Sequence, residues 1–266
     1  MANNNPRTPN RPATSSPAPA RKAFYTILVA IVLIGAGTII YLKNNQNKPA
    51  TEQSNPTLDA MRRNYANAGP PQPYVLGDTT APVVIEEFAD FECPSCGRYA
   101  TITEPDVRKQ LIETKRALYK YYDFPLPMHK NTQAASMAAA CANEQGKFWE
   151  MHDQLFGGQD QWGLGPDEGE VTNEPKPIFA GYAKTIGLDM TKWEQCFDSK
   201  KYQGRIDANA AEALRRNVEQ TPTFFINGTK VAGAMPFDDM QKLVAAATKK
   251  GPMSAADSAL SNIVKH

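Results

Sequence analysis

The chain has 266 residues, of which 41% are hydrophobic, and its 29 basic and 28 acidic residues leave a formal net charge of +1. Such a balance is that of an ordinary globular protein with one large domain or two small ones. It provides no charge excess of the kind that binds a polyanion, so we expect no nucleic-acid partner.

The first 42 residues predict a tail and a membrane anchor. Residues 1–22 contain no acidic residue and are rich in Asn, Pro, Ser and Ala, which predicts a disordered cytoplasmic tail. Residues 23–42 carry no charge, and at about 1.5 Å per residue they match the roughly 30 Å core of a bilayer. The run is too long for a cleaved signal peptide, and the basic flank before it places the N-terminus in the cytoplasm. We therefore expect a single-pass cell-membrane protein whose folded domain is extracytoplasmic, on the periplasmic or cell-wall side.

The rest of the chain predicts a tether and one folded domain. Residues 43–73 are polar and predict a tether with one short helix around 57–68. Within the folded domain, 74–250, β-branched and aromatic residues predict strands and helical spacing predicts helices. The expected strands are 82–91 and 116–126, and the expected helices are 97–113, 131–145, 147–156 and several within 178–218, with a Gly/Pro-rich loop at 157–177.

The last elements predict a hairpin and a helix. The stretch 221–234 contains two strand-like runs around Asn227 and Gly228, which tolerate the positive φ of a tight turn. A helix is expected at 236–249 and a loose tail at 251–266. Without a helical insertion at about 130–218, the order is βαβ followed by ββα. The predicted fold class is therefore α/β, with the layout of a thioredoxin fold.

Cys93 and Cys96 form a C-x-x-C pair directly after the first strand, at the start of a helix. Such a pair can be a redox centre, half of a metal site or a structural bridge. A structural zinc site usually needs two closely spaced ligand pairs, whereas Cys141 and Cys196 stand alone, so we expect no metal. The helix start favours the thiolate form of Cys93 and hence redox chemistry.

Three stretches together carry a family resemblance. APVVIEEFADFECPSC at 81–96, AACANEQGKFWEMHDQLF at 139–156 and TPTFFING at 221–228 resemble the DsbA-like thioredoxin-fold thiol:disulfide oxidoreductases. The resemblance covers roughly residues 74–250 and implies an inserted helical domain. Together with the apolar run at 23–42, it predicts a membrane-anchored member of the family. It also implies that the redox-active disulfide Cys93–Cys96 takes the place of a cofactor, with Cys93 as nucleophile and Cys96 as resolving thiol.

Glu87 is the expected proton carrier of this centre. Alternation along the strand places it on the same face as Val83 and Ile85, whereas Glu86 faces the other way. A buried carboxylate has a raised pKa and can exchange a proton near neutral pH. The resemblance implies a proton relay to the second cysteine. The alternative is an ordinary strand acid that reaches solvent.

The resemblance assigns further residues to the site. Pro222 corresponds to the cis-proline that packs against the redox pair, and Thr221 offers backbone groups to an extended substrate. Pro94 and Ser95, between the cysteines, are assigned to substrate binding as well.

Three more residues stay outside the catalytic set. Outside the cytoplasm, an even remainder of cysteines favours a structural Cys141–Cys196 disulfide, and some members of the family carry such a second bridge. His152 lies at helical spacing from aromatic residues and is expected to pack in the core.

The predicted function is to introduce disulfides into exported proteins as a monomer, with a DsbB-like or VKOR-like membrane partner that restores the disulfide. Two alternatives stay open. One is a reductase or isomerase of the same fold, since Ser95 does not settle the redox direction. The other is a non-catalytic anchored binding or chaperone module, in which the cysteine pair is only structural.

Overall fold

The computed structural model describes residues 55–163 and 174–250, with Leu33, Gly35 and Thr38 as isolated positions. The predicted tails at 1–22 and 251–266, and most of the apolar run at 23–42, lie outside the described residues. Within the part of the chain that is described, no helix combines the length and the apolar character needed to cross a membrane.

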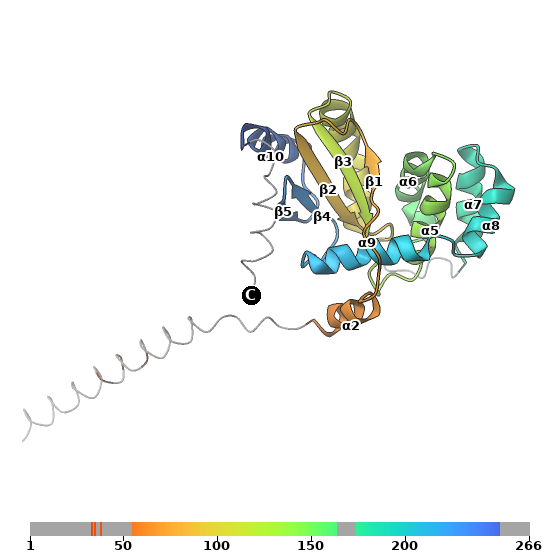
Figure 1. The fold of residues 1–266 in the computed structure, drawn as a ribbon, viewed down its shortest axis with the longest axis horizontal. Helices are drawn as coiled ribbons and strands as arrows, with labels where there is room; N and C mark the ends of the chain where they lie inside the picture. The colour runs from red at the N-terminus through yellow and green to blue at the C-terminus, as the bar shows by residue number, and fades with distance from the viewer. Residues whose placement is uncertain (1–32, 34, 36–37, 39–54, 164–173, 251–266) are drawn as a thin grey trace, which may run out of the picture. The chain divides into compact units, whose positions relative to one another are not determined.

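A five-stranded sheet in the order β1-β3-β2-β4-β5 lies at the centre of the fold (Figure 1). β2 and β3 are parallel, and the other neighbouring pairs are antiparallel. The hairpin between β4 and β5 turns at Asn227 and Gly228, with φ of 43° and 80°. The predicted α/β fold class is confirmed. The strands are β1 (Tyr74–Leu76), β2 (Val83–Ala89), β3 (Ala117–Asp123), β4 (Thr223–Ile226) and β5 (Thr229–Ala232). The short β1 was not predicted, because three residues are too few to show an alternation.

The crossover from β2 to β3 is one irregular helix from residue 94 to residue 112. It consists of α3 (Pro94–Arg98), the π-helical η1 (Tyr99–Thr103), α4 (Glu104–Val107) and the π-helical η2 (Arg108–Ile112). Pro105 lacks an N–H group and its ring crowds the carbonyl four residues earlier, which a wider π turn accommodates. The predicted helix at 97–113 is thus present, but it begins at Pro94, whose fixed φ suits a first helical turn.

Helices cover both faces of the sheet. On one face, residues of β2, β3 and β4 pack against the crossover helix and α10 (Phe237–Lys250). On the other face, Phe88 and Phe225 pack against α9 (Gln203–Arg215) and α2 (Pro56–Asn64). α2 buries Leu58 and Met61, both 4% exposed. Each such side chain contributes about 1.5–3 kcal/mol, so this part of the predicted tether packs on the domain.

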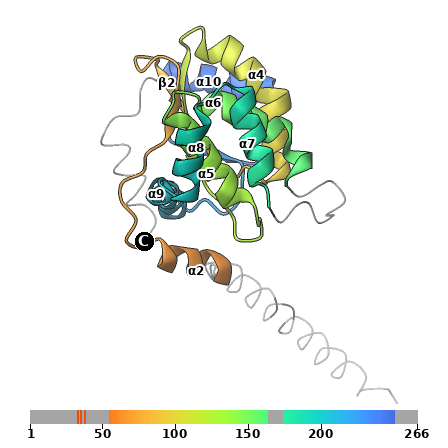
Figure 2. The ribbon, with the colours of Figure 1, turned by 90° about the vertical axis from the view of Figure 1, so that its right-hand side faces the viewer.

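The remaining helices form the insertion between β3 and α9, and Figure 2 shows α5 to α8 as one group. They are α5 (Thr132–Asn143), α6 (Phe148–Gly157), the short η3 (Gln159–Gln161), α7 (Lys176–Thr185) and α8 (Met190–Asp198). Cys141 of α5 and Cys196 of α8 form a disulfide across a sequence separation of 55. A loop of this size corresponds to about 4 kcal/mol of stabilisation on the chain-entropy model. The apolar core of the insertion is continuous with Phe91, Cys93 and Cys96.

Candidate active site

Cys93 and Cys96 lie where β2 gives way to the crossover helix. Cys93 is the N-cap of α3 with extended φ and ψ of −70° and 122°, and its carbonyl accepts the N–H of Gly97 at 3.0 Å. Its own N–H donates to the carbonyl of Asp90 at 3.1 Å. Pro94 is exposed and Ser95 half-buried, so the two residues between the cysteines face outward. The cysteine pair is therefore held by the helix start, and the two residues between the cysteines are accessible.

The two thiols are free, and their pKa values are shifted in opposite directions. A hydrogen bond from Cys96 is the main cause that lowers the pKa of Cys93 to about 6, against the opposing effect of burial. Burial raises the pKa of Cys96 well above its ordinary value, and the neighbouring Cys93 raises it further. Cys93 is thus a thiolate at neutral pH and Cys96 a thiol, which is the division of roles that thiol–disulfide exchange requires.

The loop before β4 lies against Cys93. The Thr221–Pro222 peptide bond is cis, and Cys93 Sγ lies 3.4 Å from the carbonyl oxygen of Thr221. Thr221 is 8% exposed. The structure therefore brings the predicted cis-proline loop to the predicted nucleophile, although residues 93 and 221 are far apart in the sequence.

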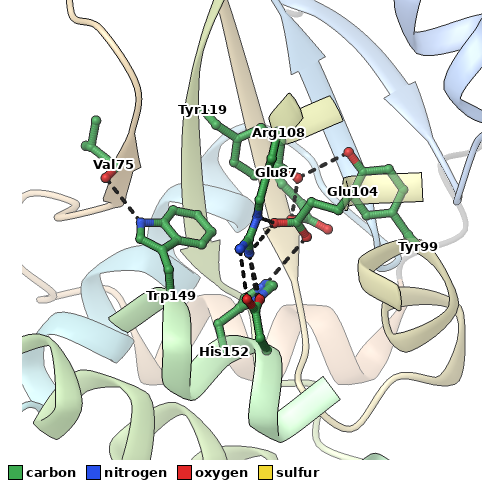
Figure 3. Close-up of polar contacts among 9 residues, drawn as sticks. Val75, Glu87, Tyr99, Glu104, Arg108, Tyr119, Trp149 and His152 are labelled. Carbon is green, nitrogen blue, oxygen red and sulfur yellow. Dashed lines mark hydrogen bonds and ion pairs between the residues drawn. The ribbon is translucent and has the colours of Figure 1, made fainter. Parts of the chain in front are cut away.

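Glu87 lies inside the sheet domain, on β2. It is 1% exposed, and Glu86 on the opposite face reaches Arg216 at 3.0 Å. Glu87 Oε2 accepts a hydrogen bond from the Tyr119 hydroxyl at 2.8 Å (Figure 3). Burial raises the pKa of Glu87 well above its ordinary value, and the charges of Glu104 and Cys93 add to this. A carboxyl group of this kind can hold and release a proton near neutral pH.

A second carboxylate near Cys93 was not part of the predicted site. Asp90 is buried, and its side chain accepts the N–H groups of Glu92 at 2.8 Å and Leu126 at 2.7 Å. Its Oδ2 also lies 2.7 Å from His129 Nδ1. Burial acts to lower the pKa of His129, but the hydrogen bond and charge of Asp90 outweigh it and the pKa is raised. The Asp three residues before the cysteine pair was the only sequence signal for this cluster.

The helical insertion also touches the redox motif. Gln159 of η3 donates from Nε2 to the carbonyls of Phe91 at 2.7 Å and Cys93 at 3.1 Å. Glu92 Oε2 accepts the N–H of Asn131, next to the first turn of α5, at 2.6 Å. Both contacts join residues of the motif to the insertion. Sequence reasoning missed them because no local pattern indicates which distant side chain fills such a position.

The remaining predicted residues have clear positions. His152 is 1% exposed and packs its ring against Phe91 and Phe156, with centroids 5.8 and 4.8 Å away. Among the described residues, no group of three or more His, Cys, Asp or Glu side chains could hold a metal ion.

Known proteins show the same fold. The sequence profile of the family described as Thioredoxin matches residues 70–246. The structure is similar to that of alpha-DsbA1 from Wolbachia pipientis, with a TM-score of 0.58, 22% identity and coverage of 70% of this chain and 96% of that one. It is equally similar to oxidised BdbD from Bacillus subtilis, with a TM-score of 0.58, 21% identity and coverage of 68% and 98%.

Curated relatives contradict the predicted location. A protein named Na(+)/H(+) antiporter NhaA 3 from Salinispora tropica is 35% identical over 179 residues, which is 67% of this chain. A protein named Na(+)/H(+) antiporter NhaA 1 from Salinispora arenicola is 34% identical over the same length. The chain spans about a quarter of the length of these relatives.

These relatives are named as ion antiporters, so the prediction of a single-pass, anchored protein with an extracytoplasmic domain is wrong. The prediction rested on one apolar run, and apolar length alone does not reveal the kind of protein in which a domain occurs. The match to the thioredoxin profile, by contrast, covers most of the chain and includes the cysteine pair and the cis-proline loop. The chain belongs to the thioredoxin family, and its fold is similar to that of the DsbA structures.

Proposed function

We propose that the protein is a thiol:disulfide oxidoreductase that introduces disulfides into other proteins. The observation that supports this best is the pair of opposite pKa displacements, with Cys93 lowered to about 6 and Cys96 raised. A dithiol whose first sulfur is ionised at neutral pH is stabilised relative to its disulfide, which favours transfer of the disulfide to a substrate.

The exchange takes place in two attacks. A substrate thiolate attacks Cys93 Sγ in the Cys93–Cys96 disulfide, a mixed disulfide forms, and Cys96 leaves with a proton from Glu87. A second substrate thiolate then attacks the substrate sulfur of the mixed disulfide and releases Cys93 as a thiolate. The substrate loses two electrons and gains a disulfide, and the cysteine pair takes up the two electrons.

The groups around Cys93 suggest how a substrate binds. The cis Thr221–Pro222 loop presents backbone next to Cys93, and an extended peptide that pairs with Thr221 would place its sulfur at Cys93. Pro94 and Ser95 lie at the accessible end of the helix and complete this surface. The substrates are proteins with thiols or disulfides, the enzyme acts as a monomer, and a DsbB-like or VKOR-like partner restores the disulfide.

The decisive measurement is the reduction potential of the Cys93/Cys96 couple. A value nearer −120 than −270 mV, the approximate values for DsbA and thioredoxin, supports the oxidase. At pH 7 a thiol pKa of about 6 stabilises the dithiol by about 1.4 kcal/mol relative to an ordinary thiol, or about 30 mV. A value near −270 mV would assign the same residues to a reductase or isomerase.

Trapping tests the roles of the sulfurs. Cys96→Ser should accumulate mixed disulfides with substrate proteins, and Cys93→Ser should not. Pro222→Ala should prolong such complexes, because the loop against the sulfur is disturbed. If wild type and both serine variants exchange no disulfide with any reduced or oxidised test protein, the pair is only structural and the chain is a binding module.

A further inference from the structure

A buried polar cluster lies beneath Glu87, between the crossover helix and the helical insertion (Figure 3). Glu104 of α4 and Arg108 of η2 come from the crossover helix, and His152 and Asp153 come from α6. Glu104 Oε1 receives Arg108 Nε at 2.8 Å and Arg108 Nη2 at 2.7 Å. Arg108 also binds both carboxylate oxygens of Asp153, at 2.8 and 3.0 Å. The guanidinium therefore joins a buried carboxylate to one whose side chain is 54% exposed.

Two atoms in this cluster are left without a hydrogen bond. Glu104 Oε2 and His152 Nε2 are both buried and unpartnered, and they lie 3.6 Å from each other. Both residues are 1% exposed. A buried polar atom without a partner costs about 1–3 kcal/mol, and each of these atoms faces the other. A proton shared between them would satisfy both.

The other ring nitrogen of His152 faces the half-exposed side chain of Asp153. His152 Nδ1 lies 2.9 Å from Asp153 Oδ1 and 3.1 Å from Arg108 Nη2. A nitrogen that close to a carboxylate oxygen acts as a donor, and Arg108 cannot accept a hydrogen bond. With the Nδ1 proton in place, Nε2 and Glu104 Oε2 present two lone pairs to each other unless one of them is protonated. The ring thus connects a half-exposed carboxylate with a buried one.

Glu87 needs such a connection. Its carboxyl group is buried and accepts a hydrogen bond from Tyr119, whose hydroxyl lies 3.3 Å from that of Tyr99. The negative charge of Cys93 raises the pKa of Glu87, and this charge disappears whenever Cys93 enters a disulfide. Glu87 therefore gains a proton in one half-reaction and loses one in the other. After burial, the charge of Glu104 is the largest cause of the raised pKa of Glu87.

We propose that His152 and Glu104 carry protons between Asp153 at the surface and Glu87, and so reset Glu87 in each half-reaction. This inference rests on the function proposed above. In the outward direction, Glu87 passes a proton to Glu104, Glu104 Oε2 passes one to His152 Nε2, and Nδ1 releases its proton to Asp153, which leaves the ring protonated at Nε2. In the inward direction, Asp153 returns a proton to Nδ1, Nε2 releases its proton to Glu104 Oε2, and Glu104 protonates Glu87. The ring is then protonated at Nδ1 again. His152 and Glu104 touch no sulfur, so they are positioning residues that act through Glu87.

Substitutions of similar size test the path. In His152→Gln, the amide keeps hydrogen-bonding atoms but cannot accept a proton on one atom and release another from the opposite side of a ring. In Glu104→Gln, the amide cannot take up and release a proton as a carboxyl group does. Turnover of a dithiol peptide by the 266-residue chain should fall about tenfold near pH 7 in both variants. The exposed Glu150→Gln, on the same helix, should not differ from wild type. In His152→Ala, added imidazole should restore turnover, which loss of packing alone would not permit.

A second measurement needs no variant of His152. The ring ¹⁵N signals of His152 should change when the wild-type protein is reduced, and this change should vanish in Glu87→Gln. If turnover and its pH profile are the same in wild type and His152→Gln, the path does not exist. If the His152 variants fail to fold, ¹⁵N signals that are indifferent to the redox state overturn it. Absence of any exchange activity in wild type would instead refute the proposed function.

Discussion

The strongest quantitative prediction concerns what ionises Cys93. The pKa of this thiol is lowered from 9.0 to about 6, and the hydrogen bond from Cys96 is the largest cause. A displacement of three pH units corresponds to about 4 kcal/mol of preference for the thiolate. Cys96→Ala removes the hydrogen bond but leaves the contact with Thr221 and the backbone N–H of residue 96. We therefore expect the Cys93 pKa to rise by roughly one to two pH units, or about 1.4–2.7 kcal/mol.

The assay is the rate of iodoacetamide alkylation as a function of pH. With a rise of about 1.5 units, Cys96→Ala should react with alkylating agent at pH 6 about one order of magnitude more slowly than the reduced wild-type protein. Cys96→Ser is the matched control, because its hydroxyl can still donate to the thiolate, and it should keep a pKa near that of wild type. An unchanged alkylation profile in Cys96→Ala would refute this account, since the helix start and the Thr221 loop would then suffice.

Three further outcomes follow from the surroundings of the cysteines. Glu87→Gln should slow turnover without abolishing it, and it should raise the free energy of unfolding at pH 7 in urea titrations. The folded state favours the protonated form of Glu87, because the pKa of this carboxyl group is raised. Its contribution to stability is therefore complete below the unfolded pKa of about 4.3 and is lost as the pH rises. Gln159→Ala should lower the unfolding free energy by about 1–3 kcal/mol, since two carbonyls lose a donor. The stability difference between wild type and His129→Gln should be largest below about pH 6.5 and shrink at higher pH. The pKa of His129 is raised, so its charged pair with Asp90 stabilises the folded state only while the ring is protonated.

Local patterns in the sequence were sufficient for four of the five strands, the cysteine pair and the orientation of Glu87. Strand alternation reports which face a residue occupies, and Glu87 indeed shares the buried face with Val83 and Ile85. The hairpin at Asn227 was predictable because a tight turn demands residues that tolerate positive φ. These features depend on neighbours in the chain, so a single sequence contains the information.

The contacts that join the insertion to the site could not be predicted in this way. Gln159 reaches carbonyls more than 60 residues earlier, and only the packing of η3 brings it there. His152 was expected to pack among aromatic rings, which it does, but the pattern says nothing about what its two nitrogens face. Glu104 lies in a helix interrupted by π turns, where a spacing of 3.6 residues no longer reports which side chains share a face. The pairing of Glu104 with Arg108 four residues later was the one available signal.

A negative charge on Cys93 opposes a second one on Cys96 or Glu87, and this repulsion links the chemistry of the site to its fold. Cys93 has a lowered pKa, whereas Cys96 and Glu87 have raised ones, and the charge of Cys93 is among the causes that raise the pKa of these two neighbours. When Cys93 is a thiolate, its two neighbours are therefore neutral. When Cys93 joins a disulfide, that repulsion ends, Glu87 can ionise, and the thiol proton of Cys96 has an acceptor. Burial of these groups lowers the stability of the fold. The same burial makes Cys96 reactive only after Cys93 has formed a disulfide, so Cys96 does not ionise while Cys93 is a thiolate.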